Sequence, residues 1–363
     1  MEHQLKVAVF FGGVSSEHEV SCVSASTVRS GLEQAGCQVT AVGITKQGDW
    51  YYFPGSAEAM ADGSWEKDPA CVPCVLSTSR SKKGLWLLGE TPRFIPLDAA
   101  VPAMHGRNGE DGTIQGLFEM ARIPYVGCGV LGSAVCMDKA VANALMDAAG
   151  VPHCKWVAAT RADLTLNGPV VLDNVQAKLG YPIFVKPANA GSSVGISKAA
   201  DRAALEKAVE IALREDDKVV FEQFIDAQEV ECAAIGNPDD PASVMTTRPG
   251  EILAGAEFYT YDDKYKNGVS QTVIPAHLSE EKLDEVRAEA RKAYLALGCS
   301  GLSRCDFFVE RGTGRVLCNE LNTLPGFTSI SMYPKLMEHE GYSYSALVDT
   351  LLQLAVHRRK GAY

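Results

Sequence analysis

The sequence predicts a protein of α/β and α+β domains that begins with a parallel sheet. Apolar runs at 5–11 and 39–44 flank a helix-like segment at 20–35. Such a strand–helix–strand unit is typical of parallel strands, which need a long crossover between them. The 363 residues correspond to two or three domains of roughly 150 residues each. A composition of 46% hydrophobic and 22% charged residues disfavours disorder, collagen and coiled coils.

The first domain follows in chain order. Its first helix ends at Gly36, where a glycine commonly terminates a helix. The segment 46–93 has little periodicity, and its polar stretches predict loops or an irregular edge. Regular alternation then predicts the strand 99–104, the helix 113–122, the strand-like run 123–126 and the helix 138–149.

Two further units are predicted after this point. Strands at 182–186 and 218–222 flank a glycine-rich loop and a helix at 201–214, which together form a small α+β unit. A turn-rich segment, 236–250, separates this unit from the last domain. In the last domain we expect a helix at 280–297, two strands and a terminal helix at 344–357.

Charge and cysteine content restrict the possible partners. Lysine and arginine number 34 against 45 acidic residues, and the net charge of −11 disfavours binding to nucleic acid or to anionic lipid. No apolar run approaches the ~20 residues of a membrane span. The N-terminal segment lacks the features of a signal peptide, so the eleven cysteines predict reduced thiols and a cytoplasmic location.

A predicted hairpin near the C-terminus brings two carboxylates together. If the turn around 312–313 pairs residues whose numbers sum to 626, Asp306 lies opposite Glu320 and Arg304 lies opposite Asn322, all on one face. Carboxylates about 5 Å apart repel each other, so a cation is expected between them. Two carboxylates and an amide suit Mg²⁺ or Mn²⁺. A shift of one residue in register would leave an ordinary solvated hairpin instead.

A loop of small residues follows the predicted strand 182–186. It reads KPANAGSSVG (186–195), and its backbone N–H groups could approach phosphate oxygens beside the cation of Lys186. The lysine precedes the loop, so this is not a Walker A motif, and alone it could equally be a flexible loop. Together with a metal site it suggests ATP. Residues 222–225 then suit adenine recognition at a strand end, although they also fit a plain strand.

Two polar loops follow predicted strands of the first domain. One contains Glu17, and the other is HGRNGEDG (105–112). Each could be a solvated loop or a helix cap. Because ligands bind at the carboxyl ends of parallel strands, two such loops side by side would form a cleft.

Two motifs favour other functions. Residues 127–132 fit the dinucleotide pattern GxGxxG, but no acid ends the next strand about 20 residues later. We interpret this segment as a tight loop against a helix, with an NAD-dependent oxidoreductase as the alternative from another class. Cys71 and Cys74 resemble a redox or zinc pair, but no second pair follows at ligand spacing, so they are interpreted as incidental thiols.

Seven stretches together resemble the D-alanine–D-alanine ligase family of the ATP-grasp superfamily. They follow the family's order over nearly the whole chain: GGVSSEHEVS (12–21), HGRNGEDGTIQG (105–116), VGCGVLGSAVCMDK (126–139), KPANAGSSVG (186–195), YDDKY (261–265), GLSRCDFF (301–308) and NELNTLPGFTSISMYP (319–334). The ITKQGDW segment (44–50) is similar to the longer form of the family. The loop at 127–132 belongs to this pattern and needs no dinucleotide.

The resemblance implies a three-domain ATP-grasp architecture. Its parts would be an N-terminal α/β domain (1–138), a central lid domain (139–235) and a C-terminal catalytic domain (236–363). The implied activity is ATP-dependent ligation of two D-alanines through a D-alanyl phosphate, for peptidoglycan precursors. The implied cofactors are two Mg²⁺ or Mn²⁺ ions, and the implied assembly is a homodimer.

The resemblance also implies roles for residues at matching positions. ATP would be bound by Lys139, Lys186, Ser193, Glu222, Gln223, Phe224, Ile225, Glu229, Lys264 and Phe308. The metal ligands would be Asp306, Glu320 and Asn322. The catalytic residues would be Glu17, Ser192, Tyr265, Arg304 and Gly326, and the substrate would also contact His105, Ser331 and Met332. YDDKY would close over the site and exclude water from the acyl phosphate.

Individual roles follow from the same resemblance. Glu17, linked to Ser192 and Tyr265, would bind the ammonium of the first D-alanine, with His105 near its carboxylate. Arg304 and the Gly326 N–H would stabilise negative charge at the reacting centre.

Two departures bear on the second substrate. Ser331 would bind its carboxylate, and Ile330 stands where many members of the family have histidine. Relatives that use D-lactate or D-serine usually have arginine where this chain has Met332. Met332 and the intact YDDKY loop therefore favour D-alanine, with D-serine or D-lactate as the alternative.

Overall fold

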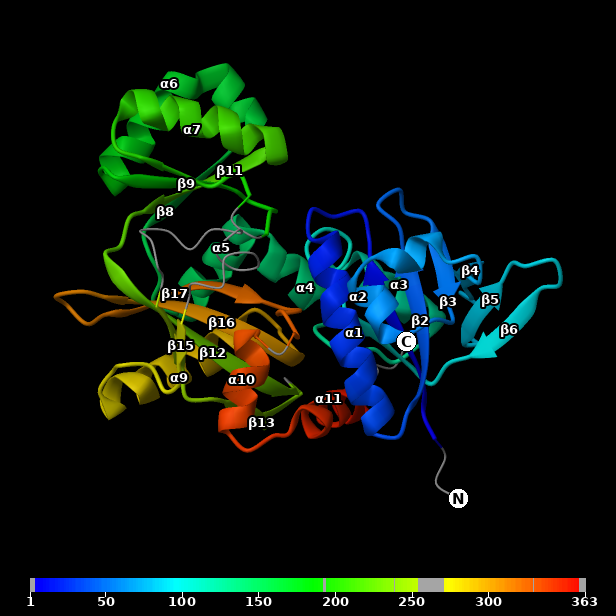
Figure 1. Ribbon diagram of the computed structural model, residues 1–363. Helices are drawn as coiled ribbons and strands as arrows, with labels where there is room; N and C mark the ends of the chain where they lie inside the picture. Colours follow the sequence, from blue (N-terminus) through cyan, green and yellow to red (C-terminus); the bar gives the residue numbers. More distant parts are fainter. Residues whose placement is uncertain (1–3, 192–193, 238, 254–270, 329, 359–363) are drawn as a thin grey trace.

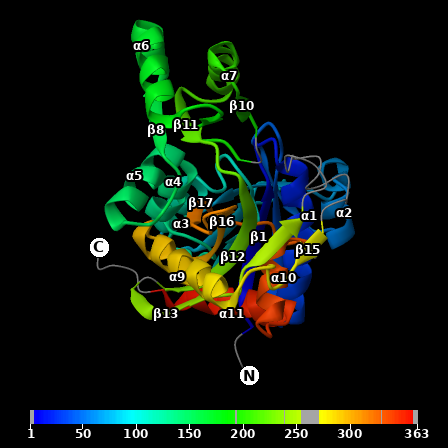
Figure 2. The same ribbon diagram turned by 90° about the vertical axis from the view of Figure 1, so that its left-hand side faces the viewer.

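The computed structural model describes residues 4–191, 194–237, 239–253, 271–328 and 330–358. Within these ranges the chain forms three sheets with helices packed against them (Figures 1 and 2). The predicted mixture of α/β and α+β units is confirmed. None of the described helices is both long and apolar enough to cross a membrane.

The first sheet has the strand order β6-β5-β4-β3-β2-β1-β7. β1 (Lys6–Gly12) pairs in parallel with β2 (Gln38–Ile44) and with β7 (Ala99–Pro102), as the opening strand–helix–strand pattern predicted. The crossover helix between β1 and β2 is α1 (His18–Gln34).

The rest of this sheet is antiparallel: of the two alternatives predicted for 46–93, an irregular edge agrees with these short strands, whereas loops alone would be wrong. The remaining elements are β3 (Trp50–Phe53), α2 (Ala57–Ala61), η1 (Ser64–Lys67), β4 (Val72–Leu76), β5 (Gly84–Leu87) and β6 (Arg93–Pro96). These strands have only four or five residues, and β4 and β6 contain proline. Such short strands carry too little alternation to be recognised from sequence.

Alternate residues of β1 enter two cores. Val7, Val9 and Phe11 pack with α1 and with the terminal helix α11 (Tyr344–His357), whereas Ala8 and Phe10 pack with α3 (Thr113–Ala121). The first core therefore joins the N-terminal sheet to the C-terminal end of the chain. The helices α4 (Val130–Met137) and α5 (Lys139–Ala149) then lead into the second sheet.

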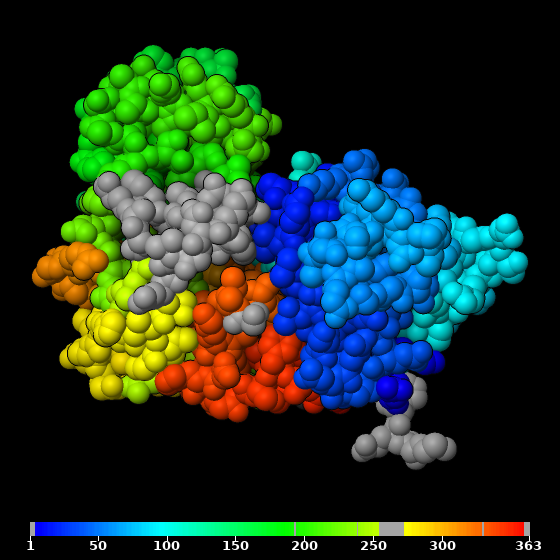
Figure 3. All heavy atoms as spheres, viewed as in Figure 1, coloured from blue at the N-terminus to red at the C-terminus, as the bar shows by residue number. Residues whose placement is uncertain are grey.

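The second sheet forms a separate lobe, with antiparallel order β10-β9-β11-β8 (Figure 3). Its elements are β8 (Trp156–Thr160), α6 (Arg161–Leu179), β9 (Ile183–Pro187), β10 (Ser197–Ala199), α7 (Arg202–Glu215) and β11 (Lys218–Gln223). α6 and α7 cover one face of the sheet through a core of aliphatic side chains and Phe221. This is the predicted small α+β unit.

The third sheet has the order β15-β14-β12-β16-β17, with β13 also paired to β12. Its elements are β12 (Ala227–Asn237), β13 (Asp240–Thr246), β14 (Gly250–Leu253), β15 (Gln271–Val273), α9 (Glu280–Ala296), β16 (Gly301–Glu310), β17 (Val316–Asn322) and α10 (Met332–His339). The segment predicted to be turn-rich, 236–250, contains β13. The expected domain boundary at 235/236 falls inside β12, and we propose a boundary just before this strand.

The β16–β17 hairpin has the predicted partners but a different turn. Asp306 lies opposite Glu320 and Arg304 opposite Asn322, as predicted. The turn is longer than two residues, because the Glu310 N–H donates to the Arg315 carbonyl (2.9 Å). A β-bulge beyond Asp306 shifts the register by one residue and restores the predicted pairs.

Candidate active site

A cleft of about 1340 Å³ lies between the three sheets. Every predicted site residue in the described ranges lines it: Glu17, His105, Lys139, Lys186, Glu222, Gln223, Phe224, Ile225, Glu229, Arg304, Asp306, Phe308, Glu320, Asn322, Gly326, Ser331 and Met332. Ser192, Ser193, Lys264 and Tyr265 lie outside the described residues. The structure therefore brings together segments that are up to 315 positions apart, from Glu17 to Met332.

A row of three carboxylates crosses the third sheet in this cleft. Glu231 on β12 lies opposite Asp306 on β16, which lies opposite Glu320 on β17. Directly opposed like charges destabilise a sheet, so the row requires cations. Arg304 supplies one of them.

Arg304 is held between two of these acids. Its Nε and Nη2 donate to the two oxygens of Asp306 (both 2.7 Å), and its Nε also lies 3.0 Å from Glu231 Oε2. Burial opposes the charge, but Asp306 and Glu231 outweigh this effect and raise the pKa of the Arg304 guanidinium. Asn322 Nδ2 donates to Asp306 Oδ2 (3.0 Å).

Two lysines face the same row from the side of the second sheet. Lys139, the first residue of α5, donates to the Ala190 carbonyl (2.7 Å) and lies 3.8 Å from Glu320 Oε2. Lys186 on β9 forms a buried ion pair with Glu222 on β11 (2.5 Å). Burial would lower the pKa of Lys186, but Glu222 more than compensates and raises it. Both lysines line the cleft.

The bulge on β17 brings the side chain of Asn319 into the cleft. Asn319 is the extra residue on β17, and its Oδ1 accepts from Lys186 Nζ (3.4 Å). Without the bulge, Asn319 would alternate to the face opposite Glu320. The irregularity therefore places an amide beside the predicted phosphate-binding lysine.

The two polar loops of the first sheet meet as predicted, because β1 and β7 are neighbours. Glu17 is buried and approaches Gly106 and Gly191 closely: a Cβ added at these glycines would lie 2.6 Å and 3.0 Å from its Oε2. Gly106 also has φ +69°, a conformation that favours glycine. The Glu17 carboxylate is thus enclosed by backbone on two sides.

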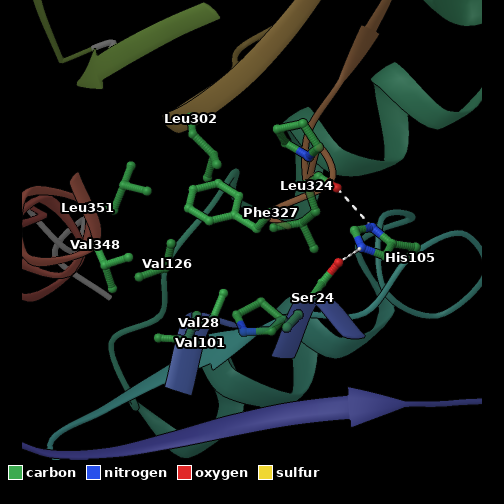
Figure 4. Close-up of a pocket in the computed structure, with 13 residues that line it drawn as sticks. Ser24, Val28, Val101, His105, Val126, Leu302, Leu324, Phe327, Val348 and Leu351 are labelled. Atoms are coloured by element: carbon green, nitrogen blue, oxygen red, sulfur yellow. Dashed lines mark hydrogen bonds between the residues drawn. The ribbon is translucent and has the colours of Figure 1, made fainter. Parts of the chain in front are cut away.

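His105 is held through both ring nitrogens. Burial lowers its pKa, and the neutral ring donates from Nδ1 to the Leu324 carbonyl (3.1 Å) while Nε2 accepts from the Ser24 hydroxyl (3.0 Å; Figure 4). A direct bond from His105 to a substrate carboxylate would replace one of these contacts.

Ser331 lines the cleft immediately before α10. Its Oγ accepts from the Thr328 N–H (3.1 Å), and its own N–H donates to the Thr328 carbonyl (3.0 Å). A Cβ at Gly326 would lie 2.8 Å from this Oγ, so the glycine permits close packing of the loop. Met332 is buried beside it, and Ile330 is 64% exposed at the rim of the cleft.

Family models match both halves of the chain. The model described as "D-ala D-ala ligase N-terminus" covers residues 6–128, and "D-ala D-ala ligase C-terminus" covers residues 145–353. The chain belongs to the D-alanine–D-alanine ligase family. It is an enzyme, and its three-sheet architecture is the ATP-grasp fold of that family.

Relatives of the D-alanine–D-alanine ligase family match over nearly their full length. The D-alanine–D-alanine ligase of Acetivibrio thermocellus is 46% identical, over 99% of this chain and 97% of that protein. The one from Caldicellulosiruptor bescii is 44% identical, over 98% and 96%. Among solved structures, the VanG D-Ala:D-Ser ligase from Enterococcus faecalis is 39% identical with a TM-score of 0.87, over 97% of this chain and all of that one. The ligase from Coxiella burnetii is 32% identical with a TM-score of 0.84, over 98% and 94%.

The structure also accounts for the two motifs that favoured other functions, the GxGxxG pattern at 127–132 and the pair Cys71 and Cys74, in agreement with membership of the ligase family. Gly132 lies in α4, where a Cβ would be 2.5 Å from the Gly298 carbonyl, so residues 127–132 pack a helix tightly. All eleven cysteines lie in the described ranges and are free. Burial raises the pKa of Cys71, and that of Cys74 to about 12. Neither thiol is activated.

Sequence reasoning missed three residues of the ligase cleft: Glu110, Glu231 and Asn319. Glu231 could have been found, because the alternation Glu229-Val230-Glu231 places two acids on one face of a strand. The position of Asn319 depends on a bulge that no local sequence pattern predicts. Glu110 lies in a quoted motif, but only the fold shows its partners.

Glu110 should make the stability of this enzyme fall as pH rises. Burial and the nearby Glu17 carboxylate raise its pKa to about 8, against the weaker effects of two backbone N–H groups and Arg304. Between about pH 5 and pH 8 the folded protein therefore holds a proton that the unfolded chain has lost. The free energy of unfolding should fall as pH rises through this range.

The measurement is urea unfolding of the wild type and Glu110→Gln at about pH 5, 6.5 and 8. We expect the free energy of unfolding of the wild type to fall by about 1–2 kcal/mol more than that of the variant over this range. A fully buried group would give a larger difference, but Glu110 is only partly buried. Equal pH slopes for the two proteins would contradict the assignment.

Proposed function

We propose that the protein joins two D-alanines at the expense of ATP, giving D-alanyl-D-alanine, ADP and phosphate for peptidoglycan precursors in the cytoplasm. The observation that supports this best is the cleft itself. It combines a row of three carboxylates, the basic side chains of Arg304, Lys139 and Lys186 in the same cleft, and a separate buried carboxylate at Glu17. A nucleotide, its metal ions and a small zwitterion need these groups in one place.

ATP would lie between the second and third sheets. Lys139 and Lys186 would bind its phosphates, and Glu222–Ile225 would hold the adenine where β11 ends. The N–H groups of Gln223 and Phe224 already donate to Lys155 and Pro182, so adenine would be recognised by other groups of this segment. Glu229 is exposed at the cleft and would reach the ribose.

The carboxylates fit magnesium. Asp306, Glu320 and Asn322 offer an all-oxygen set, and in the described residues no three His, Cys, Asp or Glu side chains form a complete metal site by themselves. Phosphate oxygens and water would therefore complete the coordination, as Mg²⁺ prefers. Bound Mg²⁺ would neutralise charge on the transferring phosphoryl group.

The first D-alanine would place its ammonium against Glu17 and its carboxylate toward the γ-phosphate. That carboxylate takes the phosphoryl group and becomes a D-alanyl phosphate, a much better acylating agent. The amine of the second D-alanine, oriented by Ser331, then attacks the acyl carbon and phosphate leaves. Arg304 and the Gly326 N–H would stabilise the oxyanion formed in this step.

The test is release of phosphate from Mg-ATP with D-alanine, together with detection of the dipeptide. We expect both products in equal amounts. ATP binding without product would indicate an idle ATP-binding protein, and thermal protection by NAD(H) but not by Mg-ATP would indicate an oxidoreductase. Light scattering tests the proposed homodimer.

We expect D-alanine to be preferred as second substrate, with kcat/KM at least about tenfold above those of D-serine and D-lactate. Met332 supports this, because it puts a buried thioether where D-serine and D-lactate relatives usually have arginine. The similarity to a D-Ala:D-Ser ligase structure makes D-serine the specific alternative. Competition assays with the three compounds decide between them, and equal use of D-serine would overturn the preference.

A further inference from the structure

The loop that carries Gly326 is held by residues from the first domain. The Leu324 N–H donates to Glu110 Oε1 (3.3 Å), and the Leu324 carbonyl accepts from His105 Nδ1 (3.1 Å; Figure 4). Both polar backbone groups of one residue are therefore bound by side chains more than 200 positions away in the sequence.

Glu110 and His105 are themselves fixed. Glu110 Oε2 accepts from the Gly106 N–H (2.7 Å), and the Glu110 N–H donates back to the Gly106 carbonyl (2.9 Å). His105 is held on its other side by Ser24. The contacts to Leu324 therefore come from a rigid loop at the end of β7.

The other side of Gly326 is anchored independently. The Tyr344 hydroxyl donates to the Phe327 carbonyl (2.9 Å), and Tyr344 begins the helix α11 that packs on α1. Gly326 thus lies between two anchored neighbours, Leu324 and Phe327. Its intervening neighbour, Pro325, has a fixed φ and no N–H of its own.

We infer that Glu110 is a positioning residue: together with His105 it fixes Leu324, and so aims the Gly326 N–H at the reacting centre. This rests on the proposed function, in which that N–H stabilises the oxyanion. Stabilisation of this kind requires the donor to be held within about 0.5 Å of its productive position. Glu110 makes its contribution without touching substrate.

The variant that tests this is Glu110→Gln. The glutamine oxygen can accept from only one of the two N–H groups, and its own NH₂ cannot accept from the other. We expect kcat for dipeptide formation to fall by about tenfold or more, while KM for ATP stays nearly unchanged. Hydrogen–deuterium exchange without substrate should become at least about fivefold faster in the peptide spanning residues 323–328.

Measuring the stability of the variant distinguishes a positioning role of Glu110 from a merely structural one. Loss of the carboxylate with its raised pKa should leave the variant no less stable than the wild type near pH 8, so lower activity there cannot come from unfolding. Glu110→Asp, which keeps the carboxyl group but has a shorter reach, should show the same accelerated exchange and provides a second variant if the first does not fold.

The matched control is Glu119→Gln. Glu119 lies on α3 in the same domain and accepts from the Tyr125 hydroxyl (2.9 Å), away from the Gly326 loop. It should leave kcat and the exchange of residues 323–328 unchanged. The inference would be overturned if Glu110→Gln kept both the wild-type exchange rate in residues 323–328 and the wild-type kcat. If the wild type makes no dipeptide, the proposed function fails, and the exchange comparison still decides whether Glu110 holds the loop.

Discussion

Replacing Asp306 with alanine is expected to reduce phosphate release by at least about 1000-fold while the protein stays folded. Asp306 is the middle member of the carboxylate row and one of the three proposed metal ligands. Its loss removes a proposed ligand and also the bidentate partner of Arg304, which would still pair with Glu231. The measurements are phosphate release with Mg-ATP and D-alanine, and Mn²⁺ binding by electron paramagnetic resonance in the presence of nucleotide.

The fold should survive because removal of Asp306 also relieves repulsion from two opposed acids. Asp240→Ala is the matched control, since Asp240 begins β13 in the same sheet and is exposed outside the cleft. It should keep full activity. An Asp306→Ala protein with near-normal phosphate release, or with unchanged Mn²⁺ affinity, would contradict the metal assignment.

The hairpin shows why local sequence pattern predicted the central part of the site. Side-chain alternation in two strands determines which residues share a face, and this depends on parity more than on the turn. Beside the turn the observed pairs differ by one residue from the predicted register, and the bulge at Asn319 restores that register before Asp306 is reached. The predicted pairs at the site are therefore present because of a bulge that no local rule could have foreseen.

Elements with strong periodicity were predictable for the same reason. The helices 280–297 and 344–357 coincide closely with α9 and α11, because each has a long apolar stripe. The short strands β3–β6 lack such a stripe. Their stability comes from pairing with distant neighbours in the sheet, and that information is not local.

Contacts between domains were the least predictable part of the site. Motifs located Glu17, His105 and Arg304, but they could not show that His105 and Glu110 bind the backbone of Leu324. Such contacts depend on how the first domain packs against the third sheet through the core shared with α11. The net charge of −11 likewise said nothing of the cations gathered in the cleft.

Replacing Lys186 with methionine is expected to lower both activity and stability. Glu222 is 4% exposed and pairs with Lys186 at 2.5 Å; without the ammonium it keeps the weaker contacts of Asn143 Nδ2 (3.4 Å) and the Cys154 thiol. Removing one partner of a buried ion pair costs about 3–5 kcal/mol, because the other charge stays desolvated. Activity should fall by at least about 100-fold through loss of a phosphate-binding cation. Urea unfolding and the phosphate assay measure the two effects.

A second substitution separates the two effects. Lys186→Met combined with Glu222→Gln removes the uncompensated charge, so most of the lost stability should return, whereas activity should not, because the phosphate still lacks its cation. Arg202→Met is the control in the same lobe: its pairs with Asp173 and Glu206 are exposed, and its loss should cost less than about 1 kcal/mol. If the double variant remained as unstable as Lys186→Met, the buried charge of Glu222 would not be the cause. If it regained activity, Lys186 would serve the Glu222 carboxylate and not the phosphates of ATP.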